Sequence, residues 1–493
     1  MCKNPSPSSP LSIPSRIRWD EFCSLCKGGQ QLMVIHGNVY DVGGWVLLAY
    51  VGEDATDPFE AFHRDDDAMK KYLVGLKVSS LVADDQSKEK DGARNKELEE
   101  DFRKQGALRS SLKAAGMYKA NPWFYLGMLA HILVLELLAW AVLKRFGSGW
   151  IAYMAAVVLL TTAQAQAGWL QHDLGHLSVF KSRSLNLLAH RFVILHLKAA
   201  SSAWWNYRHY LHHAKPNIQD TDPDINMPYV FMLGESMSRR WAKKQREGKV
   251  KGFLPYSLQH QYCEKRRTEQ ERNTGVMGLN GKGGRWIIGP PLLLPIYFHY
   301  ENLRYVIGNA VWGKSGMWKD SYGTERYLRQ HRRFFWEEFL WMASFFIRWH
   351  LMYGPLLGGL WGWFGLYMTV RVIESHWFVW VTQMSHIPMS ISKFDEAEHH
   401  DWPSLQLAAT CNVEGGAFND WFTGHLNYQI EHHLFPTMPR HNYPKVAPLV
   451  RDLFAKHGMK HKYESKKLLQ AFGDILSSLE RYGKAWEHAF YET

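Results

Sequence analysis

Three groups of closely spaced histidines stand out among the 25 histidines of this 493-residue chain. They lie in the segments "HDLGH" (172–176), "HYLHH" (209–213) and "QIEHH" (429–433). Residues three or four apart share one face of a helix, so imidazoles at these spacings can converge on a metal ion. Many neutral imidazoles with few carboxylates suit iron or zinc better than calcium or magnesium. The candidate ligands are His172, His176, His209, His212, His213, His432 and His433, with Gln429 beside them.

The candidate ligands are more numerous than one metal ion requires. A zinc hydrolase needs three protein ligands and a separate base. Seven histidines imply two metal ions, and two redox-active irons imply chemistry with molecular oxygen. The alternative is that each group is a set of surface or core histidines without a metal. Three groups, each at the end of an apolar segment, argue against that alternative.

Long apolar segments must position these histidines. Residues 121–146 and 150–170 are each long enough to cross the hydrocarbon core of a bilayer. Two further apolar zones lie near 286–312 and at 334–385, and the second is long enough for a span plus a further segment. About four transmembrane helices are therefore expected. The exact count stays open because charged residues and a proline interrupt the last zone.

The order of spans and histidine groups predicts their side of the membrane. The first group directly follows the second apolar segment, and the second group comes soon after it with no span between. The third group follows the two later zones. If those zones cross the membrane twice, all three groups share one face, whereas an odd number of crossings would separate them. The basic loops 239–252 and 263–285 place that face in the cytosol by the positive-inside rule.

Composition supports a membrane protein rather than a nucleic-acid-binding one. The formal charge of +11 comes from basic loops between apolar segments, which fits anionic lipid. The 22 tryptophans are typical of aromatic belts at a membrane interface. Residues 1–16 lack the apolar core of a signal peptide and are expected to form a disordered cytosolic tail. Cys23 and Cys26 form a single CxxC without a second pair, which favours free thiols over a zinc or redox site.

Beyond these patterns, six segments carry a resemblance to a known family. They are "WLQHDLGHLSVF", "WWNYRHYLHHAKPN", "DPDINM", "ESHWFVWVTQMSH", "ATCNVE" and "FNDWFTGHLNYQIEHHLFPTMPRHN". The chain resembles the membrane fatty acid desaturases, and within them the front-end desaturases with a fused cytochrome b5 domain. Gln429, in place of a histidine, is the mark of the front-end group. The resemblance implies a mainly α-helical integral membrane protein with about four transmembrane helices, a cytosolic di-iron cap and a small N-terminal α+β cytochrome b5-like domain.

The resemblance also implies an activity. Two iron ions and O2 would remove hydrogen from an unactivated methylene of a polyunsaturated fatty acyl chain, leaving a cis double bond of the delta-5 or delta-6 type. The substrate is expected to be an acyl-CoA, and the electrons to come from cytochrome b5 and its NADH-dependent reductase. The expected place is the endoplasmic reticulum membrane, with both termini cytosolic. Alternatives are a sphingolipid desaturase or lipid hydroxylase on the same scaffold, or a non-catalytic protein without a working electron donor.

Further site residues follow from the same resemblance. His386 in "TQMSH" resembles another iron ligand, and Gln429 is expected to bind iron directly or through water. His425 is expected either to bind iron or to donate a hydrogen bond to an iron ligand. Asp173, Asp220, Asp222 and Asp224 are expected either to hold imidazole N–H groups or to cap helices and sit in solvated loops. An acyl tunnel must be apolar, and its candidate lining residues, which also fit interfacial anchors, are Trp204, Trp205, Trp377 and Phe378.

The N-terminal region lacks part of a haem site. The expected domains are 17–85, similar to cytochrome b5, a charged linker at 86–118, and a desaturase domain at 119–493. His63, at the end of "GEDATDPFEAFH", matches the second haem histidine of that family. The first is missing, because "YDV" runs directly into "GGWVLLAY" as though Gly43-Gly44 were the remnant of an HPGG segment.

Two interpretations of the missing histidine remain open. His36 lies on the strand before Tyr40 and is a poor replacement, so haem b binding is in question. Either a separate cytochrome b5 supplies electrons, or the sequence comes from a faulty gene prediction or a splice form. Residues 263–285 and 313–335 also look like insertions relative to the family, which favours the second interpretation.

Overall fold

The computed structural model gives the fold of most of the chain, including all three histidine groups. The Gly43-Gly44 segment, residues 263–285 and most of 313–335 lie outside the described residues. The described residues are 13–41, 47–63, 73–82, 96–103, 108–226, 231–250, 256–257, 259, 296–307, 332–393 and 401–491.

A small α+β domain forms the N-terminal part, as the sequence predicts. Its four-stranded sheet has the order β1-β4-β3-β2, with β1 and β4 parallel and the other pairs antiparallel. His36 and Gly37 have φ angles of 49° and 69°, and this left-handed backbone makes the tight turn between β2 and β3. The elements are β1 (Arg16–Ile17), α1 (Trp19–Lys27), β2 (Leu32–Ile35), β3 (Asn38–Asp41), η1 (Leu47–Tyr50), α2 (Thr56–Phe62) and β4 (Lys77–Leu81).

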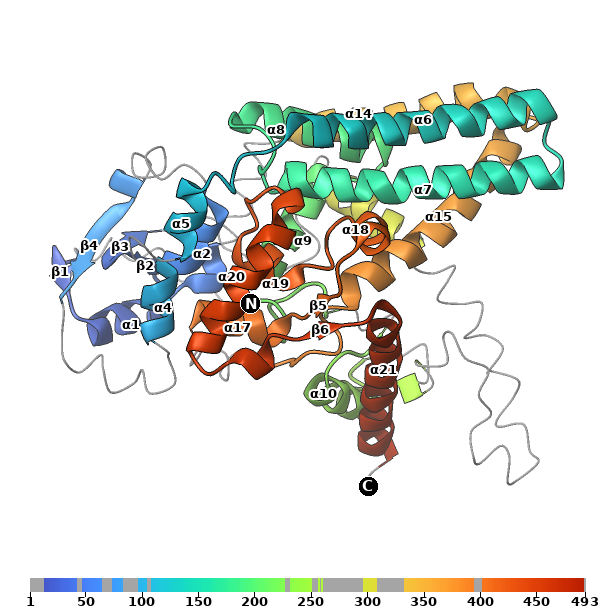
Figure 1. The fold of residues 1–493 in the computed structure, drawn as a ribbon. Coiled ribbons are helices and arrows are strands. Elements are labelled where there is room, and N and C mark those ends of the chain that lie inside the picture. Colours follow the sequence, from blue (N-terminus) through green and yellow to red (C-terminus); the bar gives the residue numbers. More distant parts are fainter. Residues whose placement is uncertain are drawn as a thin grey trace.

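The segment expected to be a charged linker contributes to the core. It contains α4 (Lys96–Arg103) and α5 (Leu108–Ala114). Leu98, Phe102 and Leu112 are buried in a cluster that also holds residues of the N-terminal domain and of the C-terminal region. Leu98 and Phe102 are four residues apart, so one face of an otherwise charged helix is apolar. The N-terminal domain therefore packs directly against the rest of the chain (Figure 1).

Two long apolar helices form a hairpin, α6 (Pro122–Phe146) and α7 (Trp150–Gly175), and lie side by side in Figure 1. The side chain of Asn121 caps α6 by accepting a hydrogen bond from the backbone N–H of Trp123. Both helices are long and apolar enough to cross a membrane. Both helices lie where the sequence predicts apolar segments of spanning length, and α7 continues through the first histidine group.

The last apolar zone forms a bent pair of helices, α14 (Arg332–Tyr353) and α15 (Leu360–Gln383). The axes differ by 115° across the short turn η6 (Gly354–Leu356). The described part of the chain thus holds two candidate spans, or three if the bent pair counts as one. Residues 296–307 are helical, but most of the zone near 286–312 is not described. The four-span arrangement stays a prediction.

Shorter elements surround the C-terminal ends of α7 and α15 (Figure 1). Two of them, α9 and α19, carry the second and third histidine groups. The long C-terminal helix α21 packs against α10, while α20 buries Val446, Val450 and Phe454 in the shared core. The segment after residue 441 is therefore largely part of the folded body. These elements are α8 (Arg183–Arg191), η3 (Phe192–Leu197), α9 (Ser202–Ala214), α10 (Glu235–Arg246), α17 (Trp402–Ala409), β5 (Asn412–Val413), α18 (Ala417–Thr423), α19 (Gln429–Leu434), η7 (Arg440–Asn442), α20 (Tyr443–Lys456), η8 (Lys460–Lys462), β6 (Ser465–Lys466) and α21 (Leu468–Tyr491).

Candidate metal centre

The three histidine groups meet at one place. The first group lies at the C-terminal end of α7, the second on α9 and the third on α19, while His386 follows α15. Close packing of α7 and α9 depends on Gly175, because a Cβ there would lie 2.2 Å from Cζ3 of Trp205. The serine hydroxyl of Ser201 caps α9 by accepting from the N–H of Trp204. Three segments distant in sequence thus present imidazoles to a common space.

The imidazoles form two groups, each able to hold one metal ion. Within each group, one ligand atom per residue lies within 4.8 Å of all the others. The run "HYLHH" is divided between them, since His209 and His213 belong to one group and His212 to the other. The larger group is His172, His176, His209, His213 and His432, and the smaller is His212, His386 and His433.

In four imidazoles Nδ1 contacts another protein group, which leaves Nε2 for a metal. His212 Nδ1 lies 2.9 Å from the Asp222 carboxylate, and His386 Nδ1 lies 3.1 Å from the carbonyl oxygen of Ala409. Equivalent contacts are His433 Nδ1 to Gln406 Oε1 at 2.9 Å and His432 Nδ1 to the Tyr443 hydroxyl at 3.1 Å. Such contacts fix the ring orientation and the tautomer of metal-binding histidines.

Among the described residues, several inward-facing nitrogens have no partner other than another imidazole. Nε2 of His432 and Nε2 of His433 are buried without a hydrogen-bond partner. His209 Nε2 lies 2.8 Å from His176 Nε2 and 3.1 Å from His213 Nε2. Metal–nitrogen bonds of about 2.1 Å place neighbouring ligand nitrogens roughly 3 Å apart. These buried, converging nitrogens therefore fit two metal ions.

Burial also favours the neutral imidazoles that a metal requires. Desolvation lowers the pKa of His209, His213, His432 and His433 well below the usual value, and neighbouring imidazoles lower it further. Desolvation likewise lowers the pKa of His386 to about 3. Desolvation also acts to lower the pKa of His212, but the adjacent Asp222 more than offsets it and raises that pKa above its usual value.

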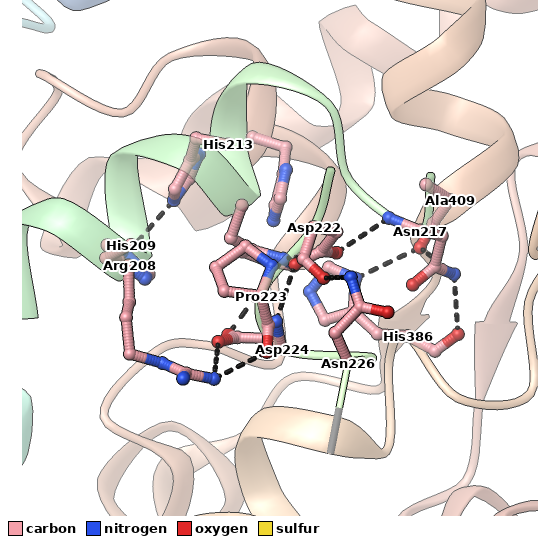
Figure 2. Close-up of polar contacts among 12 residues, drawn as sticks. Arg208, His209, His213, Asn217, Asp222, Pro223, Asp224, Asn226, His386 and Ala409 are labelled. Carbon is pink, nitrogen blue, oxygen red and sulfur yellow. Dashed lines mark hydrogen bonds and ion pairs between the residues drawn. The ribbon is translucent and has the colours of Figure 1, made fainter. Parts of the chain in front are cut away.

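Three of the four candidate aspartates lie at the centre, and one lies away from it. Asp222 contacts both His212 and the backbone N–H of Asn217, and Arg208 reaches Asp224 at 3.2 Å (Figure 2). Asp173 Oδ1 is 3.7 Å from His172 Nδ1, and its other oxygen accepts from the Tyr125 hydroxyl at 2.6 Å. By contrast, Asp220 is exposed and pairs with Arg240 at 2.7 and 2.8 Å.

Two further predicted residues have different positions. Gln429 Nε2 lies 2.8 Å from His386 Nε2, so its amide reaches the smaller group. His425 belongs to neither group and packs edge-on against Phe124, with ring centroids 5.7 Å apart. Burial lowers the pKa of His425 to about 4. Its backbone φ of 64° belongs to the turn that follows α18.

An apolar pocket of about 190 Å³ opens onto both groups. Its lining includes His172 and His209 from the larger group and His212 and His386 from the smaller one. It extends along α15, where Phe378 and other side chains of one helix face line it. Such a pocket suits a hydrocarbon chain better than a polar ligand.

The predicted tunnel residues divide between this pocket and other contacts. Trp204, Trp205 and Phe378 line the pocket. Trp377 instead stacks on Phe422, with centroids 4.8 Å apart, and its N–H donates to the carbonyl of Phe422. Three of the four residues therefore belong to the pocket wall, and the fourth packs on α18.

Comparisons with known proteins agree with this geometry. The family model described as fatty acid desaturase matches residues 148–273 and 284–465. The model described as cytochrome b5-like haem/steroid binding domain matches residues 18–81. The chain belongs to the cytochrome b5-fused front-end fatty acid desaturases.

Two relatives match almost the whole desaturase. Fatty acid desaturase 2-like protein FADS2B of Mus musculus is 42% identical over 483 residues, covering 96% of this chain and 86% of the relative. Fatty acid desaturase 3 of Bos taurus is also 42% identical over 483 residues, covering 96% of this chain and 95% of the relative. The resemblance stated from the histidine segments is thereby confirmed.

The cytochrome b5-like domain of this desaturase has two histidines, His36 and His63. His63 Nδ1 lies 2.6 Å from the carbonyl oxygen of Phe59. His36 is engaged differently, with Nε2 3.3 Å from the Glu60 carboxylate. The sequence has no histidine between His36 and His63. The residues present therefore do not fit a haem held between two histidines.

Some residues of the site carry no sequence signal. The side-chain oxygen of Gln406 accepts from Nδ1 of His433, and its Nε2 donates to the carbonyl of His213 at 3.3 Å, but its segment "SLQLAAT" resembles any buried helix. Tyr443 stands outside the histidine segments and supports His432 through its hydroxyl. Their roles depend on how α17 and α20 pack against α19, which residue spacing does not encode.

Proposed function

We propose that this desaturase introduces a cis double bond, of the delta-5 or delta-6 type, into polyunsaturated fatty acyl-CoA. One observation carries the proposal: two groups of converging imidazoles lie at the wall of an apolar pocket. His172, His176, His209, His213 and His432 would hold one iron, and His212, His386 and His433 the other, with Gln429 beside the second.

The bound metal ions and the protein side chains would have different roles. Two irons bound there would supply the oxygen chemistry that removes hydrogen from an unactivated methylene. The chain holds the imidazoles in place through Asp222, Gln406 and Tyr443. The apolar pocket excludes water and aligns the acyl chain, whose methylenes offer no charge to bind, so the position of the new double bond depends on pocket shape.

We propose that a separate cytochrome b5, reduced by its NADH-dependent reductase, supplies the electrons. The support is the lack of a second haem histidine near His63. The long apolar helices α6 and α7 support membrane association. We place the enzyme in the endoplasmic reticulum membrane with both termini in the cytosol, because the basic segment of α10 lies close to α21 on the metal-binding side.

The test is expression in a host that makes no polyunsaturated acids but has its own cytochrome b5. Eighteen- and twenty-carbon dienoic and trienoic acids are fed, and double bonds in the products are mapped by mass spectrometry. A new double bond on the carboxyl side of the existing ones supports the proposal, and its position names the specificity. A hydroxylated product or an altered long-chain base would contradict it.

A variant pair ties any product to the metal centre. His213→Ala removes a buried imidazole of the larger group, and His461→Ala removes an exposed one on η8. We expect product from His461→Ala and none from His213→Ala at equal protein abundance. Product from both variants would contradict the assignment of the site.

A further inference from the structure

A group of charged side chains is buried beside the apolar pocket. The Lys198 ammonium forms an ion pair with Glu374, and its Nζ also donates to the backbone carbonyl of Gln164 at 3.1 Å. The Arg371 guanidinium lies 3.2 Å from the other oxygen of Glu374 and 2.8 Å from Gln164 Oε1. The side chains of Lys198, Glu374 and Arg371 are 6%, 5% and 2% exposed. The group joins α7, the end of η3 and α15.

This charged group carries more positive than negative charge. Among the residues that the structure describes, Glu374 is the only carboxylate within ion-pair distance of Lys198 or Arg371. Removing charges from water is costly, and a buried ion pair contributes little to stability compared with apolar packing. Two buried cations sharing one carboxylate are therefore hard to explain by folding alone.

The charged group forms part of the pocket wall. Lys198 and Glu374 both line the pocket, and along α15 Glu374 is the lining residue most distant in sequence from His386. Glu374 and Gln383, which also lines the pocket, are nine residues apart on this helix, or about 14 Å along its axis. An acyl chain with one methylene at the metal centre and its length along α15 would pass Lys198.

A saturated chain and an unsaturated chain would interact differently with this wall. A methylene cannot compensate a buried ammonium that has lost its water. A double bond presents π electrons, which attract a cation as an aromatic face does. Lys198 already makes such a contact, since its Nζ lies 5.2 Å from the ring centroid of Phe378, another residue of the wall.

We propose that Lys198 is a specificity-determining residue that recognises a double bond already present in the acyl chain. This inference rests on the proposed desaturase function and assigns the preference for unsaturated chains to a named group. Lys198 acts on the bound chain at a distance from the metal centre, so its loss changes substrate choice rather than the reaction itself.

The test uses the full-length enzyme in membranes of the expression host. Equal amounts of a dienoic and a monoenoic acyl-CoA of the same length compete, the monoenoic chain lacking the double bond farther from the carboxyl group. Lys198→Met keeps the length of the side chain and leaves Arg371 and Glu374 as a balanced pair. We expect the ratio of dienoic to monoenoic product to fall about fivefold, equivalent to about 1 kcal/mol.

Two control variants separate charge from packing. Lys243→Met makes the same substitution at an exposed lysine of α10, which does not line the pocket, and Lys198→Arg retains the cation. Both are expected to keep the wild-type ratio within about twofold, well inside the effect of a lost cation–π contact. If Lys198→Met does not accumulate, Lys198→Gln gives the same comparison with a polar, uncharged side chain.

The outcomes distinguish this inference from the proposed function. An active wild type whose ratio is unchanged in the Lys198→Met or Lys198→Gln variant overturns the role of Lys198 and leaves the desaturase function intact. An equal fall in both products also overturns it, since that result indicates a structural role. A wild type that forms no new double bond from any chain overturns the proposed function, and this inference with it.

Discussion

The metal centre and the cytochrome b5-like domain are both histidine sites of one family, but they bring very different numbers of histidines together. Around the metal centre, eight histidines converge in two groups, and four of them are fixed through Nδ1 by a second residue. In the N-terminal domain His63 matches the second haem histidine of the family by sequence, while no histidine stands at the position of the first. An electron donor can be replaced by a separate protein, whereas a metal ligand in a buried cluster cannot.

The incomplete domain nevertheless remains part of the structure of the enzyme. The Tyr50 hydroxyl donates to the backbone carbonyl of Ala214, directly after the second histidine group. Phe62 lies edge-on to His213, with ring centroids 6.0 Å apart. Lys215, 3% exposed, pairs with Glu53 at 2.5 Å. The domain therefore contributes packing contacts and an ion pair beside α9.

The largest effect is expected from a ligand of the smaller metal group. His212→Ala removes an imidazole that no described neighbour can replace, because His386 and His433 already belong to the same group. We expect desaturation to fall below detection and the iron content of purified enzyme to fall by about half, since a group of three ligands loses one. Iron is measured by mass spectrometry against His461→Ala. Wild-type iron content in His212→Ala would refute the two-group arrangement.

A smaller loss is expected from the carboxylate behind that ligand. Asp222→Asn keeps the shape of the side chain but removes the charge that orients His212 and stabilises its N–H. Changes of this kind typically reduce metal affinity or activity about 10- to 100-fold. The matched control is Asp220→Asn, because Asp220 is exposed and pairs with Arg240. Chelator titration of iron-loaded enzyme provides the measurement, and equal chelator sensitivity of the two variants would argue against the orienting role.

The contact between the N-terminal domain and α9 predicts a stability effect without a redox effect. Glu53→Ala leaves the buried ammonium of Lys215 without its carboxylate. We expect a loss of about 1–2 kcal/mol in the free energy of unfolding, less than for a fully buried pair because Glu53 is partly exposed. The thermal midpoint in detergent is the measurement. An unchanged midpoint would indicate that the domain does not support the fold.

The smallest effect is expected at the remaining haem-type histidine. His63→Ala removes the histidine that corresponds by sequence to a haem ligand, and we expect product formation in the cytochrome b5-containing host to change less than about twofold. Co-expression with extra cytochrome b5 should raise product formation equally in the wild type and in His63→Ala. A large loss of activity in His63→Ala, with unchanged abundance and stability, would show that the fused domain still carries electrons.

Much of the site could be predicted from residue spacing alone. The seven box histidines and His386 all lie in the two groups, because i,i+3 and i,i+4 spacing on a short helix brings imidazoles together wherever that helix sits. The apolar helices α6 and α7 could equally be predicted, since hydrophobic length is a local property. His425 showed the limit of this reasoning, because its spacing matched a ligand but its backbone turned it away.

The sequence by itself determined which residues could bind metal, which segments are apolar enough to span a membrane, and that a haem histidine is missing. Only the tertiary structure decided how the histidines divide between two groups, since a single run, "HYLHH", serves both. It also decided that Gln406 and Tyr443 support ligands, that Leu98 and Phe102 join the core, and that Lys198 meets Glu374 beside the pocket. The physical reason is that periodicity fixes the face of one helix, whereas contacts between helices depend on packing that no single segment encodes.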